Sequence, residues 1–111
     1  MRPPRRAGLL LAAGALVLSA CGPPTSGRPV ADLWQELCAG CHAADGSGVR
    51  ARRGLDPGVD LRRSEMIRRN DRGLVFQRIA RGYAAMPGFG HKLPQGDLEM
   101  LTQFVMQLPR E

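Results

Sequence analysis

Five consecutive residues, Cys38-Ala39-Gly40-Cys41-His42, place the strongest constraint on what this chain can fold into. Two thiols separated by two residues lie about one helical turn apart, so both can bond to neighbouring groups of one flat ligand. This spacing, with a histidine directly after the second cysteine, is the attachment signature of c-type haem, in which each thiol forms a thioether with a vinyl group. Cys38 and Cys41 are thus predicted to hold a haem, and His42 is predicted to be an axial ligand of its iron.

Two other uses of a Cys-x-x-Cys pair have less support. A thioredoxin-like dithiol needs a βαβ context, and the sequence has no strand pattern. A structural zinc site needs a second pair of ligands at similar spacing. The only other cysteine is Cys21 and the only other histidine is His91, and they are far apart in the sequence. Because the attachment motif occurs once, we expect one covalent haem c per chain.

The first twenty residues have the pattern of an export signal. Arginines at the start precede an apolar run from Ala7 to Ala20, which has the length of a signal-peptide core and is too short to span a bilayer comfortably. The run ends in Leu18-Ser19-Ala20-Cys21, which resembles the lipobox of bacterial lipoproteins, where the cysteine sulfur receives a diacylglyceryl group. We expect a lipoprotein-type signal peptide over 1–20 and lipidation of Cys21. The alternative is an ordinary secretory signal, with Cys21 an incidental thiol.

Removal of such a signal leaves a flexible tether over 21–28, rich in turn-forming residues and expected to pack against nothing, and a domain over 29–111. A domain this small buries little core by itself and usually needs a disulfide, a metal or another staple. A covalent haem would meet that need. The predicted location is the periplasm or another extracytoplasmic face, with a lipid anchor in a bacterial membrane.

The basic residues do not have the pattern of a nucleic-acid-binding surface. The formal charge of +6 falls to +3 without the three arginines of the predicted signal. Most of the remaining basic residues lie between Arg50 and Arg81 and have almost no aromatic residues among them, whereas a nucleic-acid site interleaves the two types. We expect solvated helix faces and no nucleic-acid partner. The alternatives are pairing with a haem propionate or steering of an acidic redox partner.

Apolar periodicity predicts an all-α fold. A helix is expected over 29–41 and a loop over 43–61, where glycine and proline are frequent and no period is sustained. Ser64 and Asp71 are expected to cap helices that end near Arg69 and Arg81. A last amphipathic helix is expected over 94–108. The residues expected to be buried by these helices are Val30, Leu33, Trp34, Leu37, Leu74, Val75, Ile79, Leu98, Leu101, Phe104, Val105 and Leu108.

The segment Leu33–His42, with Trp34 four residues before the first haem cysteine, resembles the N-terminal helix of small bacterial mono-haem cytochromes c of class I. The resemblance extends over about 29–109 and includes Met86-Pro87. It implies four or five short helices around one haem, with Phe104 of the last helix packed against Trp34. It also implies that a backbone carbonyl at or near Pro57 accepts the Nδ1–H of His42.

The family's distal iron ligand is a methionine in a Met-Pro loop, and Met86 matches that position. A thioether is a soft donor that raises the reduction potential of haem iron. Three other methionines, Met66, Met100 and Met106, lie in helical patterns and are expected to fill the core. His91 is the rival sixth ligand, and bis-histidine ligation would lower the potential.

The function that the resemblance implies is outer-sphere electron transfer by a carrier that is not itself an enzyme. Its expected partners are redox proteins that dock transiently, together with the membrane that holds the anchor, and the domain is expected to be monomeric. The alternatives are a haem-based ligand binder or sensor, and a peroxide-reducing protein. Both require a labile sixth ligand.

Overall fold

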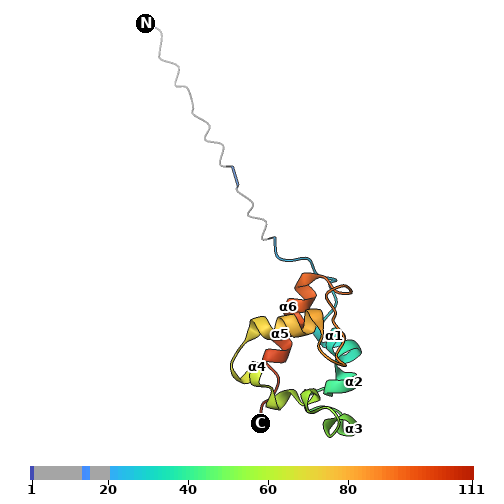
Figure 1. Cartoon of the computed structure of the whole chain (residues 1–111). Coiled ribbons are helices and arrows are strands. Elements are labelled where there is room, and N and C mark those ends of the chain that lie inside the picture. Colours follow the sequence, from blue (N-terminus) through green and yellow to red (C-terminus); the bar gives the residue numbers. More distant parts are fainter. Residues whose placement is uncertain (2–13, 16–20) are drawn as a thin grey trace.

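The computed structural model describes residue 1, residues 14–15 and residues 21–111. Most of the predicted signal peptide, including Leu18, Ser19 and Ala20 of the lipobox, lies outside the described residues. Figure 1 shows the domain that follows residue 21 as a set of short helices joined by loops. Within residues 21–111 no strand occurs, and a single bridge joins Tyr83 and Met86. No helix among the described residues is long and apolar enough to cross a membrane.

The prediction of an all-α fold is therefore confirmed, with six α-helices within residues 21–111 in place of the four or five expected. The additional helices are single turns, which carry too few residues to show a period. The α-helices are α1 (Val30–Leu37), α2 (Ala39–His42), α3 (Arg50–Arg53), α4 (Glu65–Arg68), α5 (Arg72–Arg81) and α6 (Gln95–Met106), and two 3-10 turns, η1 (Pro57–Val59) and η2 (Leu61–Arg63), lie between α3 and α4.

The predicted helix over 29–41 is interrupted at Cys38. The backbone of this residue turns away from helical geometry at a φ of −121°, and its carbonyl then accepts the amides of Cys41 and His42 at 3.1 and 3.0 Å. α2 thus starts as a new turn directly after α1. The prediction of a structureless loop over 43–61 is wrong at α3 and η1, because short helical turns leave no apolar period in the sequence.

The predicted starts of α4 and α5 are confirmed. The Ser64 hydroxyl accepts the Ile67 amide, and the Asp71 carboxylate accepts the Leu74 amide at 2.9 Å. α5 ends at Gly82, whose φ of +77° suits a residue without a Cβ. Leu74 departs from the prediction, because its side chain is exposed on the outer side of α5 while Val75 and Ile79 are buried.

Helix α6 forms the centre of the domain, because it packs against both α1 and α5. The buried cluster combines residues from these helices with Ile67 of α4 and Phe89 of the loop after α5. Leu33 of α1 and Leu101 of α6 have no exposed surface. The domain thus has one core, built mainly where α1 and α5 meet α6, and the haem motif lies at the end of α1.

The segment before α1 also packs against α6, which differs from the expectation that residues 22–27 contact nothing. The Pro24 carbonyl accepts the amide of Gly96, and the Ser26 amide donates to the carboxylate of Asp97. We name residues 23–26 the strap.

Candidate functional site

The three residues of the predicted attachment motif lie together at the junction of α1 and α2. Cys38 and Cys41 are half-buried and are not joined in a disulfide, and His42 is half-buried directly after them. Burial raises the pKa of the Cys38 thiol to about 11, so this thiol is protonated at neutral pH. The hydrogen bonds from Cys41 and His42 to the Cys38 carbonyl hold the two thiols and the imidazole on one helical turn.

The imidazole of His42 is held in one orientation by the backbone. Its Nδ1 lies 2.9 Å from the carbonyl oxygen of Val59. Because a carbonyl can only accept, Nδ1 must carry the proton, and Nε2 retains the lone pair that a metal ligand needs. The sequence places this carbonyl at or near Pro57, and the structure has it two residues further along, at the end of η1.

Two consecutive caps position the Val59 carbonyl. The Asp56 carboxylate accepts the Gly58 amide at the start of η1, and the Asp60 carboxylate accepts the Arg62 amide at the start of η2. Asp60 is buried and also binds the Arg62 guanidinium at 2.9 Å through each of its two oxygens. This guanidinium holds the pKa of the Asp60 carboxyl below its ordinary value. The spacing Asp56-x-x-x-Asp60 is the sequence signal that could have located this carbonyl.

The loop after His42 folds back onto the same segment. The Gly48 amide donates to the His42 carbonyl at 2.8 Å, and the Leu61 amide donates to the Gly46 carbonyl at 2.8 Å. Gly48 has a φ of +80°, and a Cβ there would lie 2.8 Å from the Val59 Cγ2. The approach of this loop to Val59 therefore depends on a residue without a side chain.

Trp34 connects the motif to the core. Its indole Nε1 donates to the Ala44 carbonyl at 3.1 Å, and its ring lies with a centroid separation of 6.1 Å from the His42 ring. On its other side, the ring of Phe104 from α6 lies at 5.1 Å. The prediction that Phe104 packs against Trp34 is thus confirmed by the structure.

Met86 lies in a tight turn after α5. The amide and carbonyl of Met86 are paired with the carbonyl and amide of Tyr83, at 2.9 and 3.0 Å. The following residues return to the end of α5, where the Phe89 amide donates to the Ile79 carbonyl and the Gly90 amide to the Ala80 carbonyl. The Met86 side chain is half-buried against the same core that Cys38 contacts, whereas that of His91 is exposed.

A comparison with protein families matches residues 25–105 to the sequence model described as cytochrome C oxidase, cbb3-type, subunit III. The chain belongs to this family. It has the all-α cytochrome c fold, and the family implies a covalently bound haem c and haem-based electron transfer. Cytochrome c domains of this kind are generally extracytoplasmic. The comparison with individual curated proteins found no match.

The residues present in this cytochrome c domain fit a haem. Two unbridged thiols on one turn supply the two thioether bonds, and an imidazole with a free Nε2 supplies an axial nitrogen. Within residues 21–111 no group of three or more histidine, cysteine, aspartate or glutamate side chains is arranged to hold a metal ion, so the zinc alternative has no ligand set there.

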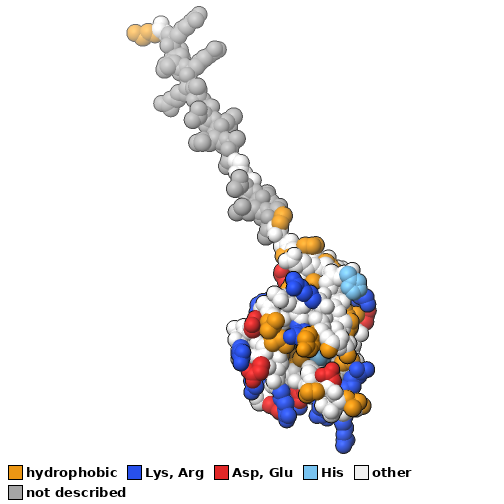
Figure 2. Space-filling model, in the orientation of Figure 1, with side chains coloured by type: hydrophobic (Ala, Val, Ile, Leu, Met, Phe, Trp, Pro, Cys, Tyr) orange, Lys and Arg blue, Asp and Glu red, His pale blue; other side chains and the backbone are white. Residues whose placement is uncertain are grey.

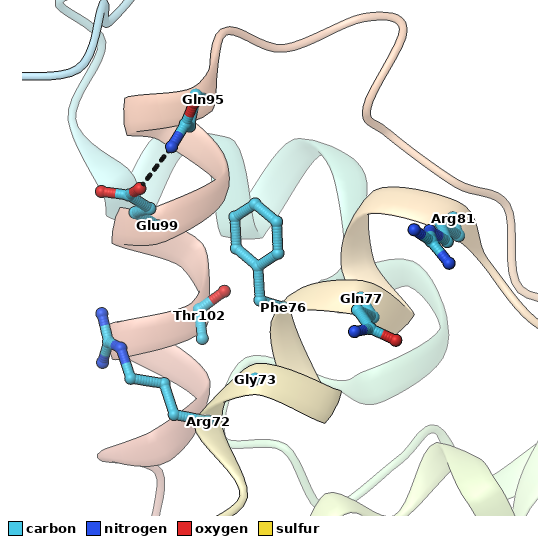
Figure 3. Close-up of a pocket in the computed structure, with 8 residues that line it drawn as sticks. All are labelled: Arg72, Gly73, Phe76, Gln77, Arg81, Gln95, Glu99 and Thr102. Carbon is cyan, nitrogen blue, oxygen red and sulfur yellow. Dashed lines mark hydrogen bonds between the residues drawn. The ribbon is translucent and has the colours of Figure 1, made fainter.

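A groove in the described part of the cytochrome c domain lies away from the motif. It has a volume of about 590 Å³ and lies between α5 and α6, and Figure 3 shows Phe76 between these two helices. None of Cys38, Cys41, His42 or Met86 lines it. Its lining includes Arg72, which hydrogen-bonds Gln103, and Gln95, which donates to Glu99 at 2.9 Å. These polar pairs cross the surface of the helices and carry no redox chemistry.

The arginines between 50 and 81 differ in whether they form ion pairs. Those of η2 and α4 form ion pairs, such as Arg63 with Glu111 at 2.9 Å and Arg68 with Glu65. The three arginines of α3 are exposed and make no ion pair with any residue in 21–111. Figure 2 shows basic side chains projecting from the end of the domain where α3 lies. The residue before α3 is bonded to the motif, since the Val49 amide donates to the Cys41 carbonyl at 3.0 Å.

Proposed function

We propose that this cytochrome c carries one electron at a time on a single haem c, bound through Cys38 and Cys41 and ligated by His42 and Met86. The haem supplies an iron that cycles between the ferrous and ferric states. The observation that carries the proposal is the hydrogen bond between His42 Nδ1 and the Val59 carbonyl. A histidine fixed in this tautomer directs Nε2 as a neutral donor, and the bond raises its basicity.

The surroundings of the motif are suited to a carrier whose ligands change little between the two oxidation states. Trp34 is held by its hydrogen bond to the Ala44 carbonyl and by packing against Phe104, so the residue next to the His42 ring is itself restrained. Met86 is restrained by its paired turn with Tyr83. Rigid ligands keep the reorganisation that accompanies electron transfer small. The thioether of Met86, as a soft donor, raises the reduction potential relative to a second histidine.

The proposed partners follow from the family and from the export signal. The family description names a subunit of a cytochrome c oxidase, which supports an oxidase-class protein as the electron acceptor. The proposed carrier is exported, and the sulfur of Cys21, which is exposed in the structure, carries a lipid that holds the domain at a membrane. The domain is proposed to work as a monomer that docks its partner transiently.

The absorption spectrum of the purified ferric holoprotein tests the ligand set. We expect a low-spin spectrum with a sulfur-to-iron charge-transfer band. The substitution Met86→Leu, which nearly conserves volume, should abolish the band. Met106→Leu, on α6, and His91→Gln, at an exposed position, are the controls and should retain it. A high-spin wild-type spectrum would favour the ligand-binding or peroxide-reducing alternatives. A low-spin wild-type spectrum without the band, which becomes high-spin in His91→Gln, would exchange the roles of His91 and Met86.

Mass spectrometry of the mature N-terminus tests the anchor. We expect a chain that begins at Cys21 with the mass of a diacylglyceryl group added. The matched variant Cys21→Ser should carry no lipid. A wild-type chain that begins elsewhere without a lipid would reject the anchor and leave the electron-transfer proposal standing.

A further inference from the structure

The strap follows the predicted lipid site in the sequence and is hydrogen-bonded to the first turn of α6. The Gly96 amide, which a helix leaves without an internal partner at this position, donates to the Pro24 carbonyl at 2.8 Å. The Ser26 amide donates to Oδ1 of Asp97 at 3.0 Å. The strap thus replaces water at the start of α6.

Asp97 is the central residue of this contact. Its side chain has no exposed surface, and Oδ2 has no hydrogen-bond partner among the described residues. A buried carboxylate is costly unless it is hydrogen-bonded, and its position in the first turn of a helix is favourable because of the helix dipole. Release of the strap would remove the only hydrogen bond that the structure records for the Asp97 carboxylate within residues 21–111.

The packing at Gly96 is equally close. A Cβ built on this residue would lie 2.5 Å from the Thr25 Cγ2 and 2.7 Å from the Pro24 oxygen. Gly96 itself has ordinary helical geometry within α6, so an alanine there would suit the helix and exclude only the strap. The sequence therefore places a poor helix former where it permits the strap to dock.

Docking shortens the reach between a lipid on Cys21 and the domain. If the segment were free up to α1, nine residue steps would separate Cys21 from Val30 and would extend up to about 32 Å. With the strap in place, only three residue steps remain between Cys21 and Pro24, which is about 11 Å at full extension. Figure 1 shows the chain after residue 21 arriving beside α6, with α3 at the opposite end of the domain.

We propose that the docked strap fixes the orientation of the domain on the membrane, with the first turn of α6 facing the phospholipid headgroups and α3 facing away. The surface that meets the bilayer comprises the strap, Gln95 and the turn that precedes α6, where Lys92 is exposed. The three unpaired arginines of α3 are then presented on the membrane-distal side. This inference rests on the proposed lipidation of Cys21, because an unanchored domain has no fixed orientation.

The single lysine of the chain provides a reporter. Lys92 is the only lysine in the sequence, so an amine-reactive nitroxide labels it. The variant Lys92→Arg has no lysine, and the nitroxide signal that remains in it comes from the N-terminal amine. The double variant Lys92→Arg/Arg52→Lys moves the only lysine to α3, at an exposed position without an ion pair. The lipidated, haem-loaded full chain is reconstituted in vesicles of phosphatidylethanolamine and phosphatidylglycerol that contain a nickel-chelating lipid. The relaxation of the nitroxide by nickel is then measured in the ferrous state.

We expect nickel to raise the relaxation rate of the nitroxide on Lys92 several-fold more than that of the nitroxide in Lys92→Arg/Arg52→Lys. Gly96→Ala should release the strap and reduce this difference to near equality. Gly73→Ala, on α5, is the matched control, because a Cβ there makes only an ordinary contact at 3.8 Å, and it should keep the full difference. Hydrogen exchange of the Ser26 amide should be faster in Gly96→Ala than in Gly73→Ala.

Three results would overturn the inference. Equal relaxation at the two positions in a chain that floats with the vesicles would reject the orientation while leaving the anchor intact. If Gly96→Ala speeds exchange of the Ser26 amide yet keeps the full difference, the domain is oriented but the strap does not orient it. A chain that does not float, and whose N-terminus carries no lipid, would reject the anchor and the orientation together.

Discussion

Replacing Gly48 with alanine tests whether the loop after His42 holds the imidazole through Val59. At this position the φ is +80°, and an added Cβ would lie 2.8 Å from the Val59 Cγ2 and 3.0 Å from both the carbonyl carbon and the carbonyl oxygen of Val59. The side-chain methyl could rotate, but the backbone atoms could move only with the segment itself. The substitution therefore strains the one residue whose carbonyl accepts the His42 Nδ1–H.

The expected cost follows from three contributions. An alanine with left-handed φ costs roughly 1–2 kcal/mol. Overpacking against a buried segment costs typically about 1–3 kcal/mol. If Val59 moves away instead of tolerating the overlap, the hydrogen bond to His42 is lost at about 1 kcal/mol. Since the overlap either persists or is relieved by losing the bond, only one of these two costs adds to that of the left-handed φ. We therefore expect the free energy of unfolding to fall by about 2–5 kcal/mol, a large share of the about 5–15 kcal/mol typical of a folded domain.

Denaturant unfolding of the ferric holoprotein measures this loss, and a redox titration measures its consequence. A weaker bond at Nδ1 makes His42 a poorer donor, so we expect the reduction potential of Gly48→Ala to rise. Gly54→Ala is the matched control, because Gly54 is exposed, has a φ of −82° and has no atom near its would-be Cβ. It should change the free energy of unfolding by no more than about 0.5 kcal/mol.

The reasoning is refuted if Gly48→Ala unfolds at the same denaturant concentration as Gly54→Ala. If Gly48→Ala is destabilised but keeps the wild-type potential, then the loop supports the fold and does not tune His42.

Two further predictions concern the packing and the charge around the motif. Phe104→Ala should lower the free energy of unfolding by about 2–3 kcal/mol, less than for a fully buried ring because Phe104 is half-buried beside Trp34; a loss below about 1 kcal/mol in chemical unfolding would contradict this. Asp60→Asn should cost about 0.5–1 kcal/mol at neutral pH, since Asn retains the cap but loses the charge that pairs with Arg62. Because Arg62 lowers the folded-state pKa of Asp60, the ionised Asp60 stabilises the fold above the ordinary aspartate pKa, and this stabilisation is lost as the pH falls through the folded-state value. The free energies of unfolding of the wild type and of Asp60→Asn should therefore converge in acid. A constant difference at all pH values would show that charge is not involved.

Much of the site could be predicted from the sequence because its chemistry is local. Cys38, Cys41 and His42 lie within five residues, and their spacing on one helical turn is decided by backbone geometry alone. The capping roles of Ser64 and Asp71 follow for the same reason, since a cap contacts amides only two or three residues away. The pairing of Trp34 with Phe104 is a long-range contact, and it was predicted through the family resemblance.

Where the sequence was insufficient, the missing information was the path of the chain between elements. The family resemblance gives the acceptor for His42 only as a carbonyl at or near Pro57. It is the carbonyl of Val59, because two caps at Asp56 and Asp60 set where the chain turns. Leu74 is exposed despite its apolar side chain, because the partners of α5 cover only one of its faces.

For this protein, the sequence by itself determined the attachment chemistry and the helical class, which depend on residues that are neighbours along the chain. Only the tertiary structure decided that the segment after Cys21 docks on α6. Its composition of glycine, proline and small polar residues predicts a free tether, since such residues bury little surface. Yet two residues about 70 positions away hold it in place. The carboxylate of Asp97 accepts a hydrogen bond from it, and Gly96 has no side chain to keep it from the helix.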